Sequence, residues 1–482
     1  MFFNTIDFAI FLPIVFVLYW FVFNNNLRLQ NALIVTASYV FYGLWDWRFL
    51  SLILFSTVVD YFIGISLAKH KNASTRKILL LTSIFINLGF LGFFKYFNFF
   101  IDNFVTAFSF MGVQLSSNSL DIILPVGISF YTFQTLSYTI DVYRNKLEPT
   151  KDFVSFCAFV SFFPQLVAGP IERATNLLPQ FYSKRTFDYT NAVNGMRQIL
   201  WGLMKKVLIA DNCAIYANLF FNNSTDYSGS TLVLGAFFFT FQIYCDFSGY
   251  SDIAIGTSKL FGFNLKRNFA FPYFSRDIAE FWRCWHISLS TWFRDYLYIP
   301  LGGSRGSVSN KIRNVFIIFI VSGFWHGANW TFIIWGALNA LYFIPLLLSK
   351  RNRSNLEVVA QGRHFANFND IFHMTLTFLM VMFAWIFFRA ENISHALSYI
   401  SGIFSSSLFS IPIFLGMKKA LLTIIFILLF MAAEWLGRHR QFALADLQAS
   451  LSKPLRWGLY YGIVITIWQF GGSPKEFIYF QF

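Results

Sequence analysis

Long apolar runs separated by short polar stretches dominate the chain. About a dozen runs approach or exceed the length that a helix needs to cross a bilayer, and the shorter or interrupted runs are typical of helices that are tilted or broken around a cavity. The stretch 152–170 contains Pro164, Gly169 and Pro170, which predicts a re-entrant segment. The apolar runs lie at 6–23, 31–44, 48–68, 78–100, 122–142, 207–221, 231–258, 313–329, 331–349, 371–388, 418–436 and 456–471.

Composition supports this pattern. Of 482 residues, 56% are hydrophobic, 21% are aromatic and only 12% are charged, and that charged fraction is about half of what soluble proteins carry. A soluble fold would leave large apolar patches exposed, and a disordered chain would not carry so much apolar mass. We therefore predict an all-α polytopic membrane protein with about 11–13 transmembrane or re-entrant helices, forming a single integral-membrane domain over residues 1–482.

The formal net charge of +14 is explained by membrane orientation rather than by nucleic-acid binding, because the basic residues flank apolar runs. The segments 103–121, 221–231 and 401–416 contain no Lys or Arg, so we place them outside the cell. This orientation puts both termini on the extracytoplasmic side. The four cysteines form no CxxC pair, so neither a metal site nor a disulfide framework is predicted. The segments that carry basic clusters, and are predicted to be cytoplasmic, are 69–77, 144–151, 259–313 and 350–363.

The block from Glu280 to Asp295 contains His286 among tryptophans and arginines. Read as one amphipathic helix, it places Trp282 and His286 on one stripe together with Leu289 and Phe293. Two interpretations remain open, a functional histidine and a packing residue of an interfacial helix. Basic residues that fall on or beside the neighbouring stripe are Arg276, Arg283 and Arg294.

His326 lies within an otherwise apolar run, and Gly323 and Gly327 flank it with a spacing of four, which permits a close helix neighbour. Burial would keep this histidine neutral and able to accept a proton. The alternative role is an interhelical hydrogen bond. Polar or amphipathic residues that share its helical face, and that we expect to line a pocket with it, are Ser322, Asn329 and Trp330.

Two carboxylates, Asp246 and Asp252, lie in the apolar run 231–258. They would either orient a histidine or arginine or belong to a structural polar network, and the sequence does not decide between these roles. The glycine-rich loop 301–306 lacks the ending of a phosphate-binding loop and is a weak signal.

Five stretches together resemble the membrane-bound O-acyltransferase (MBOAT) family, in the bacterial branch that includes the alginate O-acetylation protein. The resemblance implies a ring of helices around a central tunnel and transfer of an acyl group, most commonly acetyl, to an extracytoplasmic polysaccharide. Acyl-coenzyme A or an acyl carrier protein would be the cytoplasmic donor, with no permanently bound cofactor, in the inner membrane of a bacterium. The stretches that carry the resemblance are 164–173, 244–252, 282–292, 294–303 and 324–330.

By motif, His326 matches the principal catalytic histidine of the family and His286 its second conserved polar position. Asn329, Trp330 or His286 would donate hydrogen bonds to the oxyanion. Trp282 and Asp246 are expected along the tunnel. The arginines Arg276, Arg283 and Arg294 would bind donor phosphates, or they are ordinary positive-inside charges.

The C-terminal segment 477–482 resembles a tyrosine-containing tail motif of some of these acyltransferases. We expect Tyr479 to act as an acyl carrier or else as an interfacial aromatic anchor. The resemblance also implies an exported acyltransferase of the serine-hydrolase type as partner. Transfer of a D-alanyl group, peptidoglycan O-acylation and transport of acylated precursors remain alternatives, and the sequence does not identify the polymer, the acyl group or the oligomeric state.

Overall fold

The computed structural model describes residues 1–110, 120, 122–471, 475, 477 and 478, and this part of the chain is helical without any strand. It divides into two compact units. The first comprises residues 1–193 and 257–266, and the second comprises residues 194–256 and 267–482. Two long helices, α9 (Tyr189–Leu203) and α11 (Gly229–Leu260), contribute to both units.

The first unit contains, in chain order, α1 (Ile6–Val17), α2 (Leu27–Asp46), α3 (Leu50–Lys69), α4 (Ala73–Leu91), α5 (Phe97–Phe110), α6 (Ile128–Tyr143), α7 (Phe153–Ser161) and α8 (Ala174–Leu177). The second contains α10 (Asp211–Asn222), α12 (Ile278–Cys284), α13 (Ile287–Phe293), α14 (Val308–His326), α15 (Trp330–Leu348), α16 (Phe368–Arg389), α17 (Ile393–Ile403), α18 (Met417–Gly437) and α19 (Lys453–Phe470).

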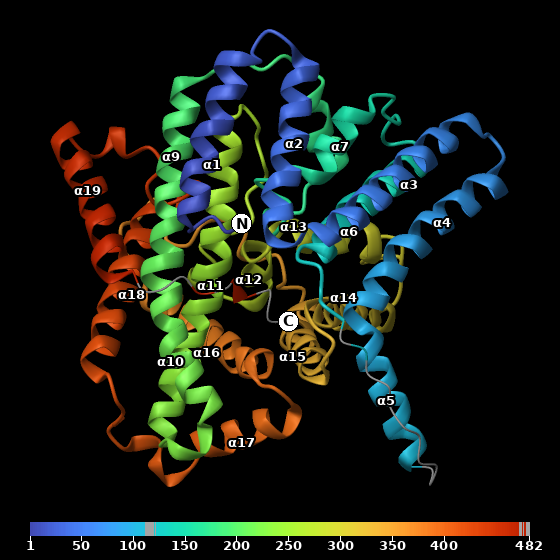
Figure 1. The fold of residues 1–482 in the computed structure, drawn as a ribbon. Helices are drawn as coiled ribbons and strands as arrows, with labels where there is room; N and C mark the ends of the chain where they lie inside the picture. The colour runs from blue at the N-terminus through green and yellow to red at the C-terminus, as the bar shows by residue number, and fades with distance from the viewer. Residues whose placement is uncertain (111–119, 121, 472–474, 476, 479–482) are drawn as a thin grey trace. The chain divides into compact units, whose positions relative to one another are not determined.

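Most of the apolar runs became helices, as predicted. By length and composition, six helical stretches of the described chain are suited to cross a membrane. The expected boundaries were least accurate around α4, which continues through a π-helical turn into α5 as far as Phe110, inside the segment predicted to be an outer loop (Figure 1). The helix α7 has nine residues, which is too short to span a bilayer and agrees with the predicted re-entrant segment. The six stretches are Leu27–Lys69, Ala73–Phe110, Gly229–Leu260, Trp330–Leu348, Phe368–Arg389 and Met417–Gly437.

A buried carboxylate joins three helices of the first unit. Asp60 on α3 accepts hydrogen bonds from Ser83 Oγ at 2.5 Å and from Asn87 Nδ2 at 2.8 Å, both on α4. Thr139 Oγ1 on α6 donates to it at 3.1 Å. Since lipid offers no hydrogen-bonding partners, these groups satisfy one another and fix how the three helices pack.

In the second unit, α14 and α15 are joined by residues 327–329 and pack closely along their length. Gly323 and Gly336 allow this approach, because a Cβ on Gly323 would collide with the carbonyl oxygen of Phe332 and a Cβ on Gly336 with that of Phe319. The close neighbour predicted from the spacing of Gly323 and Gly327 is therefore α15. The contact fixes the end of α14, where His326 lies.

We expect Gly336→Ala to destabilise the protein by about 1–3 kcal/mol, the usual cost of overpacking a tight contact. In an open helical position the same change is favourable by roughly 0.5–1 kcal/mol. Gly458→Ala on α19 is the matched control, since a Cβ there meets nothing within 4 Å. Thermal unfolding in detergent should show a lowered midpoint for Gly336→Ala alone, and equal midpoints would contradict the proposed tight contact.

Candidate active site

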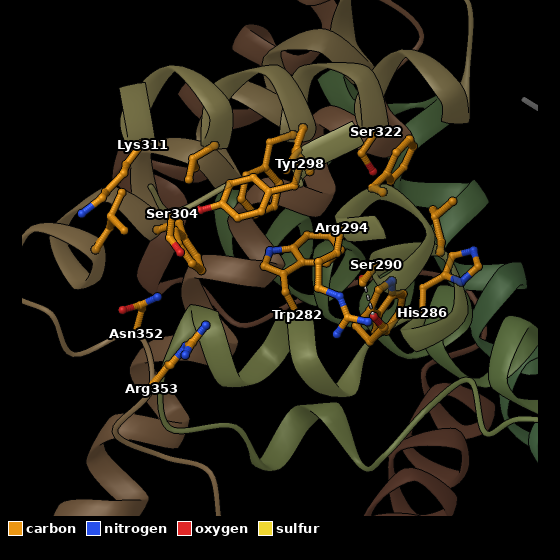
Figure 2. Close-up of a pocket in the computed structure, with 18 of the residues that line it drawn as sticks. Trp282, His286, Ser290, Arg294, Tyr298, Ser304, Lys311, Ser322, Asn352 and Arg353 are labelled. Atoms are coloured by element: carbon orange, nitrogen blue, oxygen red, sulfur yellow. Dashed lines mark hydrogen bonds between the residues drawn. The ribbon is translucent and has the colours of Figure 1, made fainter. Parts of the chain in front are cut away.

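The second unit encloses a cavity of about 520 Å³ between α12, α13, α14, α15 and the segment after α15. Both histidines singled out in the sequence line it. Figure 2 shows His286 at one end of the labelled residues, with Lys311, Asn352 and Arg353 at the other. The cavity therefore has a histidine end and a cationic end.

Aromatic rings enclose the histidine end. His326, the last residue of α14, is 4% exposed, and its ring centroid lies 5.2 Å from that of Trp335 and 5.1 Å from that of Phe388. The indole of Trp325 contacts both histidines, with centroid distances of 4.9 Å to His326 and 5.9 Å to His286. The two imidazoles, which both line the cavity, thus pack against one indole behind its lining.

His286 corrects the prediction of a single amphipathic helix over 280–295. The helix stops at Cys284 and restarts at Ile287, and His286 between them adopts a left-handed conformation with φ of 43°. Such a conformation costs a non-glycine residue on the order of 1–3 kcal/mol, so the surrounding contacts must hold it. Asn268 provides such contacts. Its backbone carbonyl oxygen accepts a hydrogen bond from Ile287 N at 2.9 Å, and its side chain contacts His286.

The contact with Asn268 sets the tautomer of His286. Ser288 N and Ser288 Oγ both donate to Asn268 Oδ1, at 3.3 and 2.9 Å, which identifies that atom as the oxygen. His286 Nδ1 lies 3.1 Å from the same oxygen and must therefore donate to it. Burial lowers the pKa of His286 to about 3, so the ring is neutral and its Nε2 is an acceptor.

Three cations, Lys311, Lys350 and Arg353, line the other end of the cavity, and Arg294 lies between that end and His286 (Figure 2). Arg294 follows α13, Lys311 lies on α14, and Lys350 and Arg353 belong to the segment after α15. All but Lys311 are exposed. Three positive charges around one end of the cavity, with a fourth along its wall, favour an anionic group on whatever molecule enters there.

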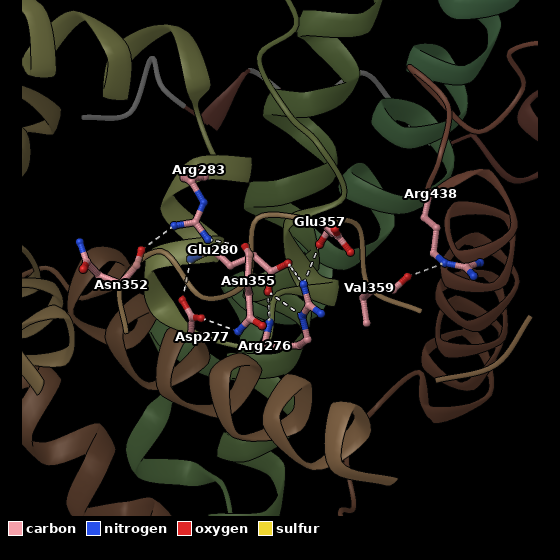
Figure 3. A network of polar contacts seen from close by, with 9 residues as sticks. All are labelled: Arg276, Asp277, Glu280, Arg283, Asn352, Asn355, Glu357, Val359 and Arg438. Carbon is pink, nitrogen blue, oxygen red and sulfur yellow. Dashed lines mark hydrogen bonds and ion pairs between the residues drawn. The ribbon is translucent and has the colours of Figure 1, made fainter. Parts of the chain in front are cut away.

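The arginines predicted to bind the donor occupy different places. Arg294 lines the cavity, whereas Arg276 and Arg283 are not among its lining residues. Figure 3 shows both in a polar network with the segment after α15. Arg283 donates to the carbonyl oxygens of Asn352 at 2.9 Å and Asn355 at 2.6 Å.

The same network continues along this segment. Arg276 pairs with Glu280 at 2.9 Å and donates to the carbonyl oxygen of Glu357 at 2.6 Å. Arg438 on α18 donates to the carbonyl oxygen of Val359 at 3.0 Å. These arginines bind the backbone of the segment that carries Lys350 and Arg353, so they position the cationic end without lining it.

Of the other predicted site residues, some line the cavity and others lie away from it. Trp282 lines the cavity and donates from Nε1 to Asn339 Oδ1 at 3.3 Å. Asn329 caps α15, and its Nδ2 donates to the carbonyl oxygen of Glu391 at 2.6 Å. Trp330 is half exposed and, like Asn329, is not among the lining residues. Asp246 pairs with Lys206 at 2.8 Å away from the cavity, and Tyr479 lies outside the described residues.

Sequence reasoning missed several residues of the cavity. Lys311, Lys350 and Arg353 were attributed to topology, because basic residues in cytoplasmic loops need no further explanation. Only their place relative to His286 and His326 gives them a role, and that place depends on tertiary structure. Ser322 was predicted to share the face of His326, and it does line the cavity.

Comparison with known proteins identifies the family. The sequence profile of the membrane-bound O-acyltransferase family matches residues 144–388. A probable alginate O-acetylase AlgI of Azotobacter vinelandii is 42% identical over 82% of this chain and 76% of its own length. The peptidoglycan O-acetyltransferase of Helicobacter pylori is 35% identical over 83% of this chain and 79% of its own. The teichoic acid D-alanyltransferase of Bacillus subtilis is 26% identical over 56% of this chain and 70% of its own.

The motif resemblance and the helical membrane architecture agree with these matches. The chain belongs to the membrane-bound O-acyltransferase family and is an O-acyltransferase.

Proposed function

We propose that this enzyme moves an acyl group, most simply acetyl, from a cytoplasmic thioester donor across the membrane for O-acylation of an extracytoplasmic polysaccharide. The observation that carries the proposal is the single cavity that joins a buried pair of histidines to a cationic end. A thioester of coenzyme A or of an acyl carrier protein bears phosphate, which matches the cationic end. Two relatives named for O-acetylation of alginate and of peptidoglycan support acetyl as the group.

The distribution of charge supports the proposed direction of transfer. Lys311, Lys350 and Arg353 lie in segments rich in Lys and Arg, which favours the cytoplasmic side. His326 ends α14 at the opposite end of that helix from Lys311. Both termini are then extracytoplasmic, in the inner membrane of a bacterium.

In the proposed reaction, a neutral His326 takes the proton of the acceptor hydroxyl as its oxygen attacks the thioester carbonyl carbon. The carbon–sulfur bond breaks, and the proton passes from the imidazole to the leaving thiolate. Ser322 lies one helical turn before His326 and also lines the cavity, so its hydroxyl is placed to donate to the developing oxyanion. Asn329 is less suited to this role, because its amide already bonds to Glu391.

The main alternative changes the acyl group. The relative named for D-alanylation of teichoic acid is consistent with a D-alanyl thioester using the same cavity. A transporter of acylated precursors is the competing class, and it requires no base in the cavity. Chemical analysis of the envelope polymers, with and without the protein, distinguishes these alternatives.

We expect His326→Ala to lower polymer acylation by about 10²–10⁴-fold, the usual contribution of a general base. The protein should remain folded and inserted, since α14 is held by its glycine contacts. His373→Ala is the matched control, because His373 is exposed on α16 and does not line the cavity. Normal acyl content in His326→Ala cells would remove the base role and favour the competing class, a transporter of acylated precursors.

We expect Arg353→Gln and Lys311→Gln each to raise KM for acetyl-coenzyme A by about tenfold, because each removes a charge-assisted contact to phosphate. The value of kcat should change little. KM for acetyl-pantetheine, which has no phosphate, should stay constant, as should both values in the control Arg351→Gln, an exposed residue outside the lining. Equal effects on the two donors would contradict phosphate recognition.

We further propose that Tyr479 carries the acyl group from the enzyme to an exported serine-hydrolase-type partner, which completes transfer to the polymer. A phenol needs a base to become a nucleophile, and its ester is a better acyl donor than an alkyl ester. The proposed base, His326, supplies the first requirement. The alternative role of Tyr479 is an interfacial anchor.

We expect Tyr479→Phe to insert normally but to lose polymer acylation, because only the hydroxyl is removed. Mass spectrometry of the wild-type protein, prepared without the partner, should detect an acyl adduct on the C-terminal peptide. Tyr461→Phe, on the exposed face of α19, is the control. Full activity of Tyr479→Phe would leave the anchor as the only role of this residue.

A further inference from the structure

Two adjacent lysines of the second unit are buried in a π-helical turn, Met204–Ala210, between α9 and α10. Lys206 is 5% exposed, and its Nζ lies 2.8 Å from Asp246 Oδ1 on α11 and 2.9 Å from Asp211 Oδ1 on α10. These two carboxylates are also buried. A π-helical turn of this kind is often found at functional sites.

The remaining bonds of this cluster go to the C-terminal segment of the chain. Lys206 Nζ donates to the carbonyl oxygen of Lys475 at 3.1 Å. The backbone N–H of Ile478 donates to Asp246 Oδ2 at 2.8 Å. Three oxygens thus surround the ammonium of Lys206, which matches its three N–H donors. Both contacts from the segment involve backbone atoms.

One side chain of the segment is inserted beside this cluster. Phe477 is 2% exposed, and its ring centroid lies 4.9 Å from that of Tyr250 and 6.0 Å from that of Phe247. The ring of Phe247 in turn packs edge-on against His286 at 4.7 Å. The C-terminal segment therefore reaches the aromatic layer that covers one histidine of the cavity.

The described residues at and after the end of α19 contact two points of one helical run. The carbonyl oxygen of Phe470, at the end of α19, accepts from Asn212 Nδ2 at 3.2 Å. Lys475 then contacts Lys206, six residues earlier in the same helical run, which corresponds to about 9 Å along a helix axis. Lys475 therefore lies beside the π-helical turn that precedes α10, and Ile478 lies at Asp246, near the centre of α11.

We propose that Lys206, Asp211, Asp246 and Tyr250 form a peptide-binding site whose ligand is the chain's own C-terminal segment. The site binds the backbone at Lys475 and Ile478 and selects an aromatic side chain at Phe477. Without the segment, Lys206 would lose a buried acceptor and Asp246 a buried donor, which is unfavourable. The purpose of docking, presentation of Tyr479 directly after Ile478, rests on the proposed function, whereas the binding itself does not.

Carboxypeptidase digestion of the full-length protein in detergent, followed by intact mass spectrometry, tests the docking. We expect the wild type to resist trimming beyond Ile478. Phe477→Ala should be trimmed past Lys475 about tenfold faster or more, the effect expected from losing one buried aromatic side chain. Equal trimming of the wild type and Phe477→Ala would overturn the proposal.

Variants elsewhere separate docking from catalysis and from folding. Tyr479→Phe should resist trimming beyond Ile478 as the wild type does, whatever its activity, so failure of the relay would not be mistaken for failure of docking. Asp246→Asn should be trimmed faster, and Lys419→Met, which changes an exposed lysine of α18, should not. Rapid trimming of both Lys419→Met and the wild type would contradict a specific site.

A second measurement requires no substitution in the helices that form the proposed site, so it does not depend on whether such variants fold. A fluorescent peptide of residues 473–482 should bind full-length Phe477→Ala saturably, as measured by anisotropy, because the weakened internal segment no longer competes. The same peptide should bind the wild type at least about tenfold more weakly. Equal binding to both proteins would indicate partition into detergent and overturn the proposal.

Discussion

The packing of the second unit depends on ion pairs that neutralise two adjacent buried lysines, Lys205 and Lys206. Lys206 requires Asp211 and Asp246, while Lys205 pairs with Asp252 at 2.8 Å and lies 3.4 Å from Glu434. A buried charge that loses its partner costs several kcal/mol, so α10, α11 and α18 are constrained to meet around these lysines. Glu434 also accepts from the hydroxyl of Tyr244 at 2.7 Å, and the ring of Tyr244 packs 5.9 Å from that of Trp285. The ionic cluster therefore supports the wall on which the histidine end of the cavity is built.

In the proposed reaction, the cavity separates recognition of the donor from chemistry along its length. At its cationic end, Lys350 and Arg353 are exposed to solvent, so the anionic donor proposed above would be attracted there at low desolvation cost. At its histidine end, His286 and His326 are buried against aromatic rings, and burial lowers the pKa of His286 to about 3. A hydrogen bond made in such surroundings is electrostatically stronger than one made in water. Arg276 and Arg283 serve this separation indirectly, because they hold the backbone of the segment that carries Lys350 and Arg353. Their guanidinium groups are suited to this task, since one arginine can bind two carbonyl oxygens in fixed geometry.

The sequence predicted the helices well because membrane helices are specified by local apolar length, and it identified His286 and His326 because polar residues in apolar runs are rare. It failed where the outcome depends on contacts between distant segments. The break at His286 requires Asn268 to satisfy the backbone and side chains of the next turn. Asp246 was expected along the tunnel, but it pairs with Lys206 of another helical segment and does not line the cavity. The role of the cations in the cavity could not be predicted, because the positive-inside rule already explains a lysine or arginine in any cytoplasmic loop.

The two histidines differ in what their surroundings permit. His286 donates its Nδ1 proton to Asn268, and a neutral ring with one donor already engaged can only accept at Nε2. It is therefore poorly suited to stabilise an oxyanion, a role that requires a donor. Protonating it would change this, but burial among Phe247, Phe269 and Trp325 opposes a charge. His286 is better suited to orient a hydroxyl or thiol that enters the cavity, by accepting its hydrogen. In the proposed reaction, that assignment leaves the hydroxyl of Ser322, on the same helical face as His326, as the hydrogen-bond donor nearest the proposed base.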